Sequence, residues 1–188
     1  MIKVISAGSA FQSGKAAEAI EKIEDKELAQ IAQGEYYFFS AQAEKCVETV
    51  KDYLDYDDVM LRLSADMLYT FANLTLGDPQ AAQRTREDVH QCLTQAMQED
   101  VPVNVKAACL FAFYVISIFL HIPPEGGTPP LQQYIPYLPI GQRLFAVSLL
   151  AHEIYLRQDY AKAKGVVQGA FLMADGVYPI AMIYLGCV

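Results

Sequence analysis

The sequence predicts an all-α domain, built as an array of antiparallel helical hairpins. Apolar residues recur with helical spacing along almost the whole chain, and short turn signals interrupt them at regular intervals. A composition of 53% hydrophobic and 19% charged residues allows 188 residues to bury a substantial core. We therefore expect one helical domain over residues 1–188.

Nine helices are expected from the spacing of apolar residues, with ends placed to within about 2–4 residues. They cover residues 2–12, 15–24, 27–39, 42–54, 58–76, 80–98, 103–120, 140–156 and 160–174. The segment 42–54 shows the pattern clearly, because its apolar residues follow the i, i+3, i+4, i+7 spacing while its charged residues take the opposite side. Such a helix buries one face and leaves the other in solvent.

The proline-rich stretch "HIPPEGGTPPLQQYIPYLPIG" interrupts this pattern at residues 121–141. Proline removes a backbone donor and clashes with the preceding helical turn, so a long helix cannot form here. We expect an extended segment with at most one short helix near 129–138. Five apolar residues are expected to anchor it: Leu131, Tyr134, Ile135, Tyr137 and Leu138.

Tight corners are predicted to join the helices in pairs, each about five residues before a small side chain. The corners are Ser13-Gly14, Ser40-Ala41, Gly77-Asp78 and Gln158-Asp159, and the small residues are Ala19, Cys46, Ala82 and Ala163. Helix axes approach within about 8–10 Å only where the contacting side chains are short. These positions are therefore expected to lie where paired helices cross.

A ladder of residue sizes repeats along the chain. Gly34, Tyr37, Cys46, Val50 and Tyr53 share their offsets with Ala151, Ile154, Ala163, Val167 and Ala170, which lie 117 residues later. That distance divides into three units of thirty-nine, a period typical of stacked helical hairpins. The central unit departs from the ladder at Asn73, Arg86 and Val89.

This ladder resembles the tetratricopeptide repeat, in which a small residue precedes an aromatic by three and an alanine by twelve. The resemblance implies a right-handed solenoid whose first helices line a concave groove, and the positions pointing into it would be Glu35 and Phe38, and His152 and Tyr155. A mixed aromatic and polar wall suits a peptide or a small ligand. The alternative is that Phe38 and Tyr155 pack against the adjacent hairpin.

Four stretches together resemble the helical N-terminal region of LuxR-type bacterial transcription regulators: "GEYYFFSAQAEKC", "LRLSADMLYTFANLTLGD", "LHIPPEGGTPPLQQYIPYLPIGQRLFAVSLLAHEIYL" and "YPIAMIYLGCV". The resemblance implies a cytoplasmic regulator whose array senses a small effector, a protein partner or a second copy, as in a homodimer, and controls a DNA-binding module. The sequence contains no basic helix-turn-helix and ends in an apolar segment. We expect DNA binding to belong to residues beyond Val188; the alternative is a free-standing adaptor or chaperone with a peptide-binding groove.

Charge and cysteine spacing exclude several classes of function. Fourteen basic against twenty-two acidic residues give a net charge of −8 with no basic stripe, which disfavours direct contact with a phosphate backbone. The cysteines at 46, 92, 109 and 187 lack the CxxC spacing of zinc sites and of disulfide frameworks, as is typical of a reduced compartment.

No membrane segment or secretory leader is expected. The longest apolar run, "AACLFAFYVISIFL" at 107–120, has fourteen residues where a membrane span needs about 20. It is expected to be a helix buried inside the protein. The N-terminal residues lack a basic leader followed by a long apolar core.

The expected protein is not an enzyme and holds no metal or cofactor. A phosphate loop is excluded because Gly8 and Gly14 enclose five residues where that motif has four, and because Ala16 follows Lys15. The three histidines, His90, His121 and His152, are evenly spaced, but repeats displaced along a stack do not bring them together.

An acidic cluster, "DYLDYDDVM", is the remaining chemical candidate. Its carboxylates are Asp52, Asp55, Asp57 and Asp58. We interpret them as a solvated turn, because acidic residues stabilise the start of a helix. A helical enzyme that holds magnesium with these carboxylates is the alternative, and it predicts stabilisation by the metal.

Overall fold

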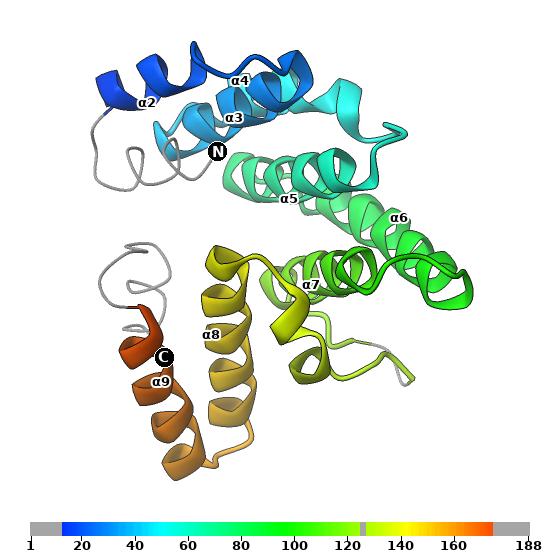
Figure 1. Cartoon of the computed structure of the whole chain (residues 1–188), viewed down its shortest axis with the longest axis vertical. Coiled ribbons are helices and arrows are strands. Elements are labelled where there is room, and N and C mark those ends of the chain that lie inside the picture. Colours follow the sequence, from blue (N-terminus) through cyan, green and yellow to red (C-terminus); the bar gives the residue numbers. More distant parts are fainter. Residues whose placement is uncertain (1–12, 125–126, 175–188) are drawn as a thin grey trace.

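The computed structural model describes residues 13–124 and 127–174, and every regular element in them is helical (Figure 1). The α-helices are α2 (Ser13–Ile20), α3 (Lys26–Phe39), α4 (Ala43–Val50), α5 (Val59–Leu76), α6 (Pro79–Gln98), α7 (Val103–Phe119), α8 (Ile140–Leu156) and α9 (Tyr160–Ala174). Three 3₁₀ turns join them, η1 (Lys51–Tyr53), η2 (Leu131–Gln133) and η3 (Ile135–Tyr137). The all-α prediction is confirmed for this part of the chain, and the helix expected at 2–12 lies outside the described residues.

Two predictions near the N-terminal end are wrong. Ser13 and Gly14 lie in the first turn of α2 and do not form a corner. The chain turns instead at residues 21–25, where the Asp25 carboxylate accepts a hydrogen bond from the Leu28 N–H at 2.9 Å and so starts α3. The helix expected at 42–54 ends at Val50 and continues as η1.

The other three predicted corners are confirmed, and they share one geometry. Ala41, Gly77 and Gln158 have left-handed φ values of 57°, 81° and 65°. In each corner the next N–H reaches back to a carbonyl five residues earlier, as from Asp78 to Asn73 at 2.8 Å. Asp78 and Asp159 then cap the helix that follows. The same residue thus closes one helix and opens the next.

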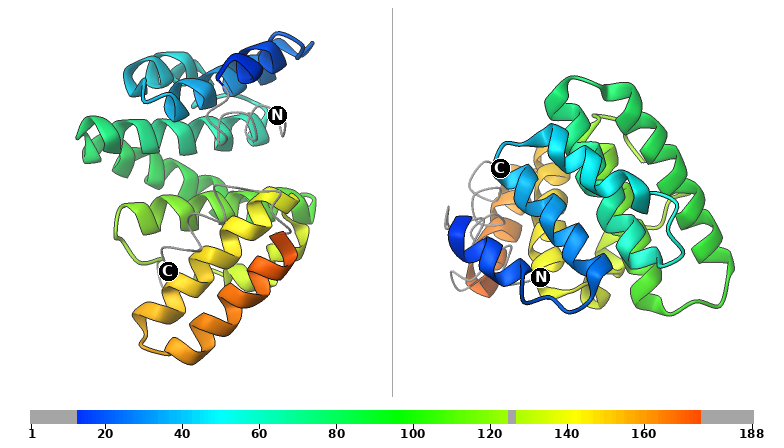
Figure 2. Two further views of the ribbon diagram at one scale, coloured as in Figure 1. Left: turned by 90° about the vertical axis from the view of Figure 1, so that its left-hand side faces the viewer. Right: turned by 90° about the horizontal axis from the view of Figure 1, so that it is seen from above.

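The helices pack in chain order, each against the one that follows it, from α2 to α9. In addition, α3 packs on α5 and α5 packs on α7, so these three helices form a layer of their own (Figures 1 and 2). The α8–α9 hairpin closes the series and is turned relative to α7 in these views.

Three of the four small residues predicted at helix crossings are buried, and the fourth, Ala19, is only partly buried. Cys46 is 0% exposed and Ala163 is 4% exposed, and Ala82 is also buried. The α3 and α4 helices approach closely at Gly34, where an added Cβ would lie 2.4 Å from Val50 Cγ1. Any side chain at this position would therefore push α3 and α4 apart.

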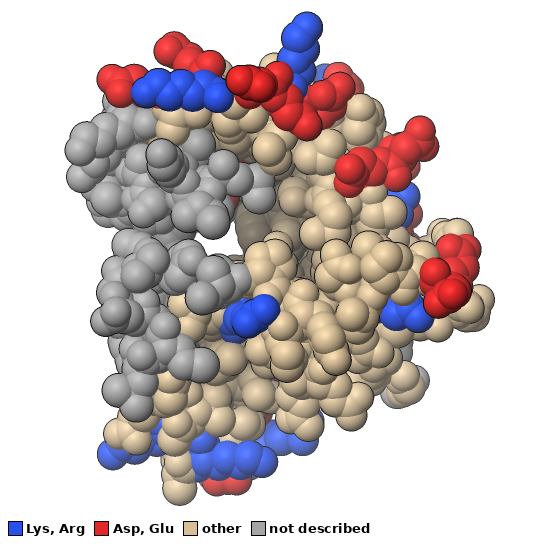
Figure 3. All heavy atoms as spheres, viewed as in Figure 1, with Lys and Arg blue, Asp and Glu red and all other residues tan. Residues whose placement is uncertain are grey.

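Exposed charges are distributed unevenly over the surface. In the view of Figure 3, Asp and Glu lie along the upper edge, over α2 to α4, where some Lys and Arg accompany them, and along the right-hand side by α5 and α6, whereas mostly Lys and Arg lie at the lower edge, by α8 and α9. The exposed bases of this lower edge include Arg157, Lys162 and Lys164. Residues 1–58 hold twelve of the twenty-two acidic and six of the fourteen basic residues, so most of the net charge of −8 belongs to the N-terminal third of the chain.

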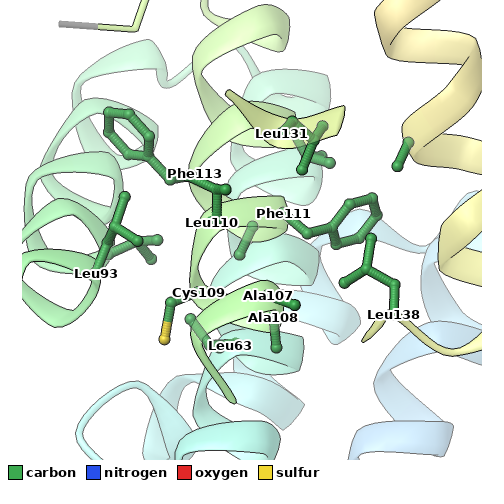
Figure 4. Close-up of a cluster of buried hydrophobic side chains, with 14 of the residues drawn as sticks. Leu63, Leu93, Ala107, Ala108, Cys109, Leu110, Phe111, Phe113, Leu131 and Leu138 are labelled. Carbon is green, nitrogen blue, oxygen red and sulfur yellow. The ribbon is translucent and has the colours of Figure 1, made fainter. Parts of the chain in front are cut away.

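The core is organised around α7, which carries buried apolar residues on all its sides (Figure 4). Leu63 of α5 and Leu93 of α6 cover it on one side, and Leu131 and Leu138 cover it on another. The expectation of a buried helix at 107–120 is confirmed. None of the described helices has both the length and the apolar character needed to cross a bilayer.

The proline-rich segment forms two 3₁₀ turns, not the single short helix that was expected. Leu131 and Leu138 are buried, and Tyr134 and Ile135 pack against the same cluster. Tyr137, however, is 49% exposed, so its prediction as an anchor is wrong. In a 3₁₀ turn, residues three apart share a side, as Ile135 and Leu138 do in facing the core, and Tyr137, two residues after Ile135 in η3, takes a different side.

Arg86 explains how the central unit tolerates a departure from the ladder. Its side chain is only 6% exposed, and the guanidinium lies 4.8 Å from the centre of the Phe113 ring. Its Nε donates to Ser117 Oγ at 2.9 Å, and a terminal nitrogen donates to the Pro123 carbonyl at 3.4 Å. A charge can be buried here because hydrogen bonds and an aromatic face replace its water.

Gly34→Ala is expected to destabilise the protein by about 1–3 kcal/mol, because the new methyl group overlaps the stiff, buried Val50 side chain. Gly165→Ala in α9 is the matched control, since no atom lies within 4 Å of its added Cβ. That exposed helical change should stabilise by up to about 1 kcal/mol. Urea unfolding followed by circular dichroism measures both, and equal stability of the two variants would contradict the close approach.

Candidate functional site

Four phenylalanines form a continuous line across three hairpins, which we call the phenylalanine stripe. Its members are Phe38 and Phe39 of α3, Phe71 of α5 and Phe119 of α7. The ring centres of Phe38 and Phe71 are 5.9 Å apart, and those of Phe71 and Phe119 are 4.8 Å apart. Phe39 contacts Phe38 edge to face at 5.4 Å. These distances and tilts are those of attractive aromatic pairs.

The packing of α3, α5 and α7 positions the stripe. The Cβ site of Gly34 lies 3.7 Å from Leu68 Cδ1, which brings α3 close to α5 at this level. Phe38 and Phe71 come one turn later on their respective helices, so their rings meet. Gly34, which allows α3 to approach α4 closely, therefore also brings α3 close to α5 one turn before the first ring contact of the stripe.

The stripe is partly exposed and has no cover among the described helices. Phe39 is 36% exposed and Phe119 is 38% exposed, while Phe38 and Phe71 are half-buried between them. Aromatic side chains rarely stay accessible in a row on a monomer surface, and such rows mark contact sites. The arrangement can take up apolar side chains of a bound segment.

The structure divides the predicted groove residues into two places. Phe38 belongs to the stripe, and Glu35 precedes it by one turn on α3. His152 and Tyr155 lie on α8, and the Tyr155 ring, 45% exposed, contacts Tyr160 of α9 at 5.3 Å. Phe38 therefore extends toward α5 and α7, whereas Tyr155 extends along its own hairpin.

Burial changes the chemistry of Glu35. Removal from water raises the pKa of its carboxyl to about 8. A neutral carboxyl one turn before Phe38 adds no charge to this part of α3 at neutral pH. The carboxyl of Glu35 becomes mostly charged only above about pH 8.

An acidic depression of about 550 Å³ lies on another part of the N-terminal hairpin. It is lined by Glu27, Gln30, Glu48, Thr49, Asp52, Tyr53 and Tyr56. The Tyr56 hydroxyl donates to Glu27 Oε1 at 3.5 Å, and the Tyr53 and Tyr56 rings are 5.2 Å apart. None of the four predicted groove residues lines it.

Three of the remaining chemical candidates, Asp58, His90 and His121, have structural roles. Asp58 caps α5, accepting from the N–H groups of Met60 at 2.8 Å and Leu61 at 3.2 Å. His90 stacks on Phe113 with ring centres 4.8 Å apart, and His121 has the left-handed φ of 56° that ends α7. No three His, Cys, Asp or Glu side chains within the described ranges are arranged to hold a metal ion.

Sequence reasoning missed two features of the chain. The first is that Phe71 and Phe119 join the stripe. The sequence pattern that could have indicated this is that each, like Phe38, is an aromatic residue in the second half of the first helix of a predicted pair. The second is that Cys92 and Cys109 face each other beside Arg62, and nothing in their spacing indicates it.

Comparisons of the chain with protein-family models, with curated proteins and with solved structures find no match. The likeness to tetratricopeptide units and to the LuxR-type region therefore stays a prediction that depends on the quoted residues.

Glu35→Gln is expected to change how stability depends on pH. Because the folded state raises the pKa of Glu35, unfolding releases a proton between about pH 4.5 and 8, and the wild type loses stability as pH rises through this window. Glutamine cannot ionise, so the variant should match the wild type near pH 5 and exceed it by about 1–2 kcal/mol near pH 8.5, after allowance for solvent screening. Chemical unfolding at both pH values measures this, with the exposed Glu44→Gln as control. A difference independent of pH would refute it.

Asp58→Ala is expected to cost about 1 kcal/mol, because α5 loses the acceptor for its first free N–H groups. Asp57→Ala, at the neighbouring exposed carboxylate, should cost less than about 0.5 kcal/mol. Thermal denaturation with and without magnesium measures both the loss and any metal effect. A rise in melting temperature with magnesium that Asp58→Ala abolishes would favour the metal-binding alternative.

Proposed function

We propose that this chain is a tetratricopeptide-like solenoid whose phenylalanine stripe binds a segment of a protein partner. The packing of α3 on α5 and of α5 on α7 supports a stack of hairpins in which the first helices share one wall. Buried small residues at matching positions, such as Cys46 and Ala163, support the repeat. The role is binding, without catalysis.

The stripe is the observation that carries this proposal. It takes one helix from each of three successive hairpins, so a partner lying along it contacts all three at once. The distances between neighbouring ring centres in the stripe are 4.8 Å and 5.9 Å. Apolar side chains one turn apart on a bound helix are also about 5–6 Å apart, so they can lie along the stripe in step with its rings. An amphipathic helix with apolar residues at such positions is therefore a suitable partner.

The resemblance to LuxR-type regulators adds a regulatory context to this binding. In a cytoplasmic regulator, occupation of the stripe by a partner, a small effector or a second copy would favour one arrangement of the hairpins over another. That change would alter how a DNA-binding module following Val188 is presented. The acidic surface over α2 to α4 would be repelled by the phosphate backbone, which supports assigning the DNA contacts to that module.

A free-standing adaptor would use the same stripe without the DNA-binding module. The coding frame downstream of Val188 separates the two functions. A basic helix-turn-helix favours the regulator, and an early stop favours the adaptor.

The binding role is tested with peptides selected from a displayed random library on the immobilised chain. Phe119→Asp should weaken the affinity of the selected peptides at least tenfold, about 1.4 kcal/mol, because a carboxylate would be placed within the apolar contact. Tyr137→Asp is the matched control, since it alters an aromatic that is also exposed but lies outside the stripe. Fluorescence anisotropy gives both dissociation constants.

Phe39→Ala provides a second variant in case Phe119→Asp disturbs folding, which circular dichroism checks. It should also weaken binding, because Phe39 is the other exposed end of the stripe. Unchanged affinity in both folded variants, or an equal loss in Tyr137→Asp, would overturn the proposal.

A further inference from the structure

Three helices bring together a group of side chains that the proposed binding function does not use, which we call the thiol cluster. It consists of Arg62 and Asp66 of α5, Cys92 of α6 and Cys109 of α7. Cys92 is half-buried, whereas Cys109 is completely buried on α7. The cluster therefore joins one partly exposed cysteine to one that is fixed in the core.

The two sulfur atoms are in direct contact. Cys92 Sγ and Cys109 Sγ are 3.6 Å apart, and a thiol proton of either can be shared with the other. A disulfide bond is about 2.05 Å long, so the sulfurs need to approach by about 1.5 Å to form one. Side-chain rotation and a small adjustment between α6 and α7 provide such a movement.

Arg62 makes Cys92 the more reactive of the two thiols. A terminal guanidinium nitrogen of Arg62 donates to Cys92 Sγ at 2.8 Å. The guanidinium is always charged, and a cation beside a sulfur stabilises the thiolate, which is the nucleophilic form. Cys109, by contrast, lies among the apolar residues that surround α7.

The other acidic groups near the cluster leave this effect in place. Asp66 follows Arg62 by one turn, and burial raises the pKa of its carboxyl to about 8, so it is largely neutral at pH 7. Asp88 of α6 is exposed to solvent, which screens its charge. The positive charge of Arg62 is therefore available to Cys92.

The ionisation of the pair follows from these contacts. The hydrogen bond from the Cys109 thiol, followed by the charge and hydrogen bond of Arg62, lowers the pKa of Cys92 to about 6 against the opposing effect of burial. The same partnership and burial raise the pKa of Cys109. These contacts favour the thiolate on Cys92 and the proton on Cys109.

We propose that Cys92 and Cys109 form a reversible redox pair, in which Cys92 reacts with a peroxide and Cys109 completes a disulfide between α6 and α7. The pair does not depend on the proposed binding function.

Each step of this oxidation balances. The Cys92 thiolate attacks one oxygen of the peroxide, a sulfur–oxygen bond forms as the oxygen–oxygen bond breaks, and the departing oxygen takes a proton from solvent to leave as an alcohol or water. The sulfur of Cys92 is oxidised by two electrons, and the peroxide is reduced. The Cys109 sulfur then attacks Cys92, and the released hydroxide combines with the Cys109 proton to form water. A thiol reductant reverses the disulfide.

Cys46 provides an internal control. It is completely buried, its thiol lies 3.9 Å from the Leu68 carbonyl oxygen, and burial raises its pKa to about 12. It has no neighbouring thiol in the described part of the chain with which to form a disulfide. Cys46 should therefore stay reduced under conditions that oxidise Cys92.

The test uses the reduced whole chain, exposed to hydrogen peroxide, alkylated and digested for mass spectrometry. The expected result is a peptide pair linking Cys92 to Cys109 that disappears after treatment with a thiol reductant. In Cys109→Ser, Cys92 should accumulate as a sulfenic acid that dimedone traps, because the second thiol is missing. Alkylation of Cys92 at pH 7 should be at least tenfold faster than that of Cys46.

Arg62 is tested separately as the residue that activates Cys92. Arg62→Gln should raise the pH midpoint of Cys92 alkylation and slow its oxidation at pH 7 at least threefold. Arg62→Lys keeps the charge and should retain most of the rate, which separates activation from a packing defect. The proposal is overturned if Cys92 reacts no faster than Cys46, if the folded wild type forms no disulfide between Cys92 and Cys109, or if both Arg62 variants behave as the wild type.

Discussion

The structure depends on one constraint: α7 is apolar around its whole circumference and must be covered on every side. Every residue from Ala107 to Phe113 is buried, and seven consecutive residues occupy all sides of an α-helix. Two neighbouring helices, α5 and α6, cover only part of this surface. The segment after α7 and helix α8 supply further cover, because η2, η3 and α8 all pack on α7. Proline prevents a regular second helix here, yet the apolar residues between the prolines fulfil the same covering role.

Charged and polar groups in the layers around α7 are buried without breaking this core. Arg86 is buried on α6 and donates to Ser117 of α7, whereas Arg62 is half-buried on α5 and donates to Cys92 of α6. Arg86 binds a hydroxyl, a carbonyl and an aromatic face, and so holds α6, α7 and the proline-rich segment together. Arg62 instead faces a sulfur. The first arrangement is structural, and the second gives a thiol unusual chemistry, because a cation stabilises a thiolate but has no comparable effect on a hydroxyl.

The hairpin corners connect this core to the surface. A left-handed residue ends each of four helices, and only one of these residues is glycine, namely Gly77. The bond that reaches back across each corner compensates for the strain of the others, Ala41, His121 and Gln158. Once the corners and the small crossing residues set the spacing of the hairpins, α3, α5 and α7 come into register. The phenylalanine stripe depends on that register, because Phe38, Phe71 and Phe119 lie far apart in the sequence and meet only when their helices are aligned.

The sequence by itself determined the helical class, the ends of most helices, three of the four corners and the small residues at the helix crossings. These features depend on local signals, namely periodic apolar residues, capping aspartates and short side chains, which act within a few residues of the chain. Only the tertiary structure decided that Phe38 meets Phe71 and Phe119, that Tyr137 faces outward, and that Cys92 meets Cys109 beside Arg62. Those contacts join residues far apart along the chain, and they depend on the rotation and distance of whole helices, which packing sets and local spacing does not encode.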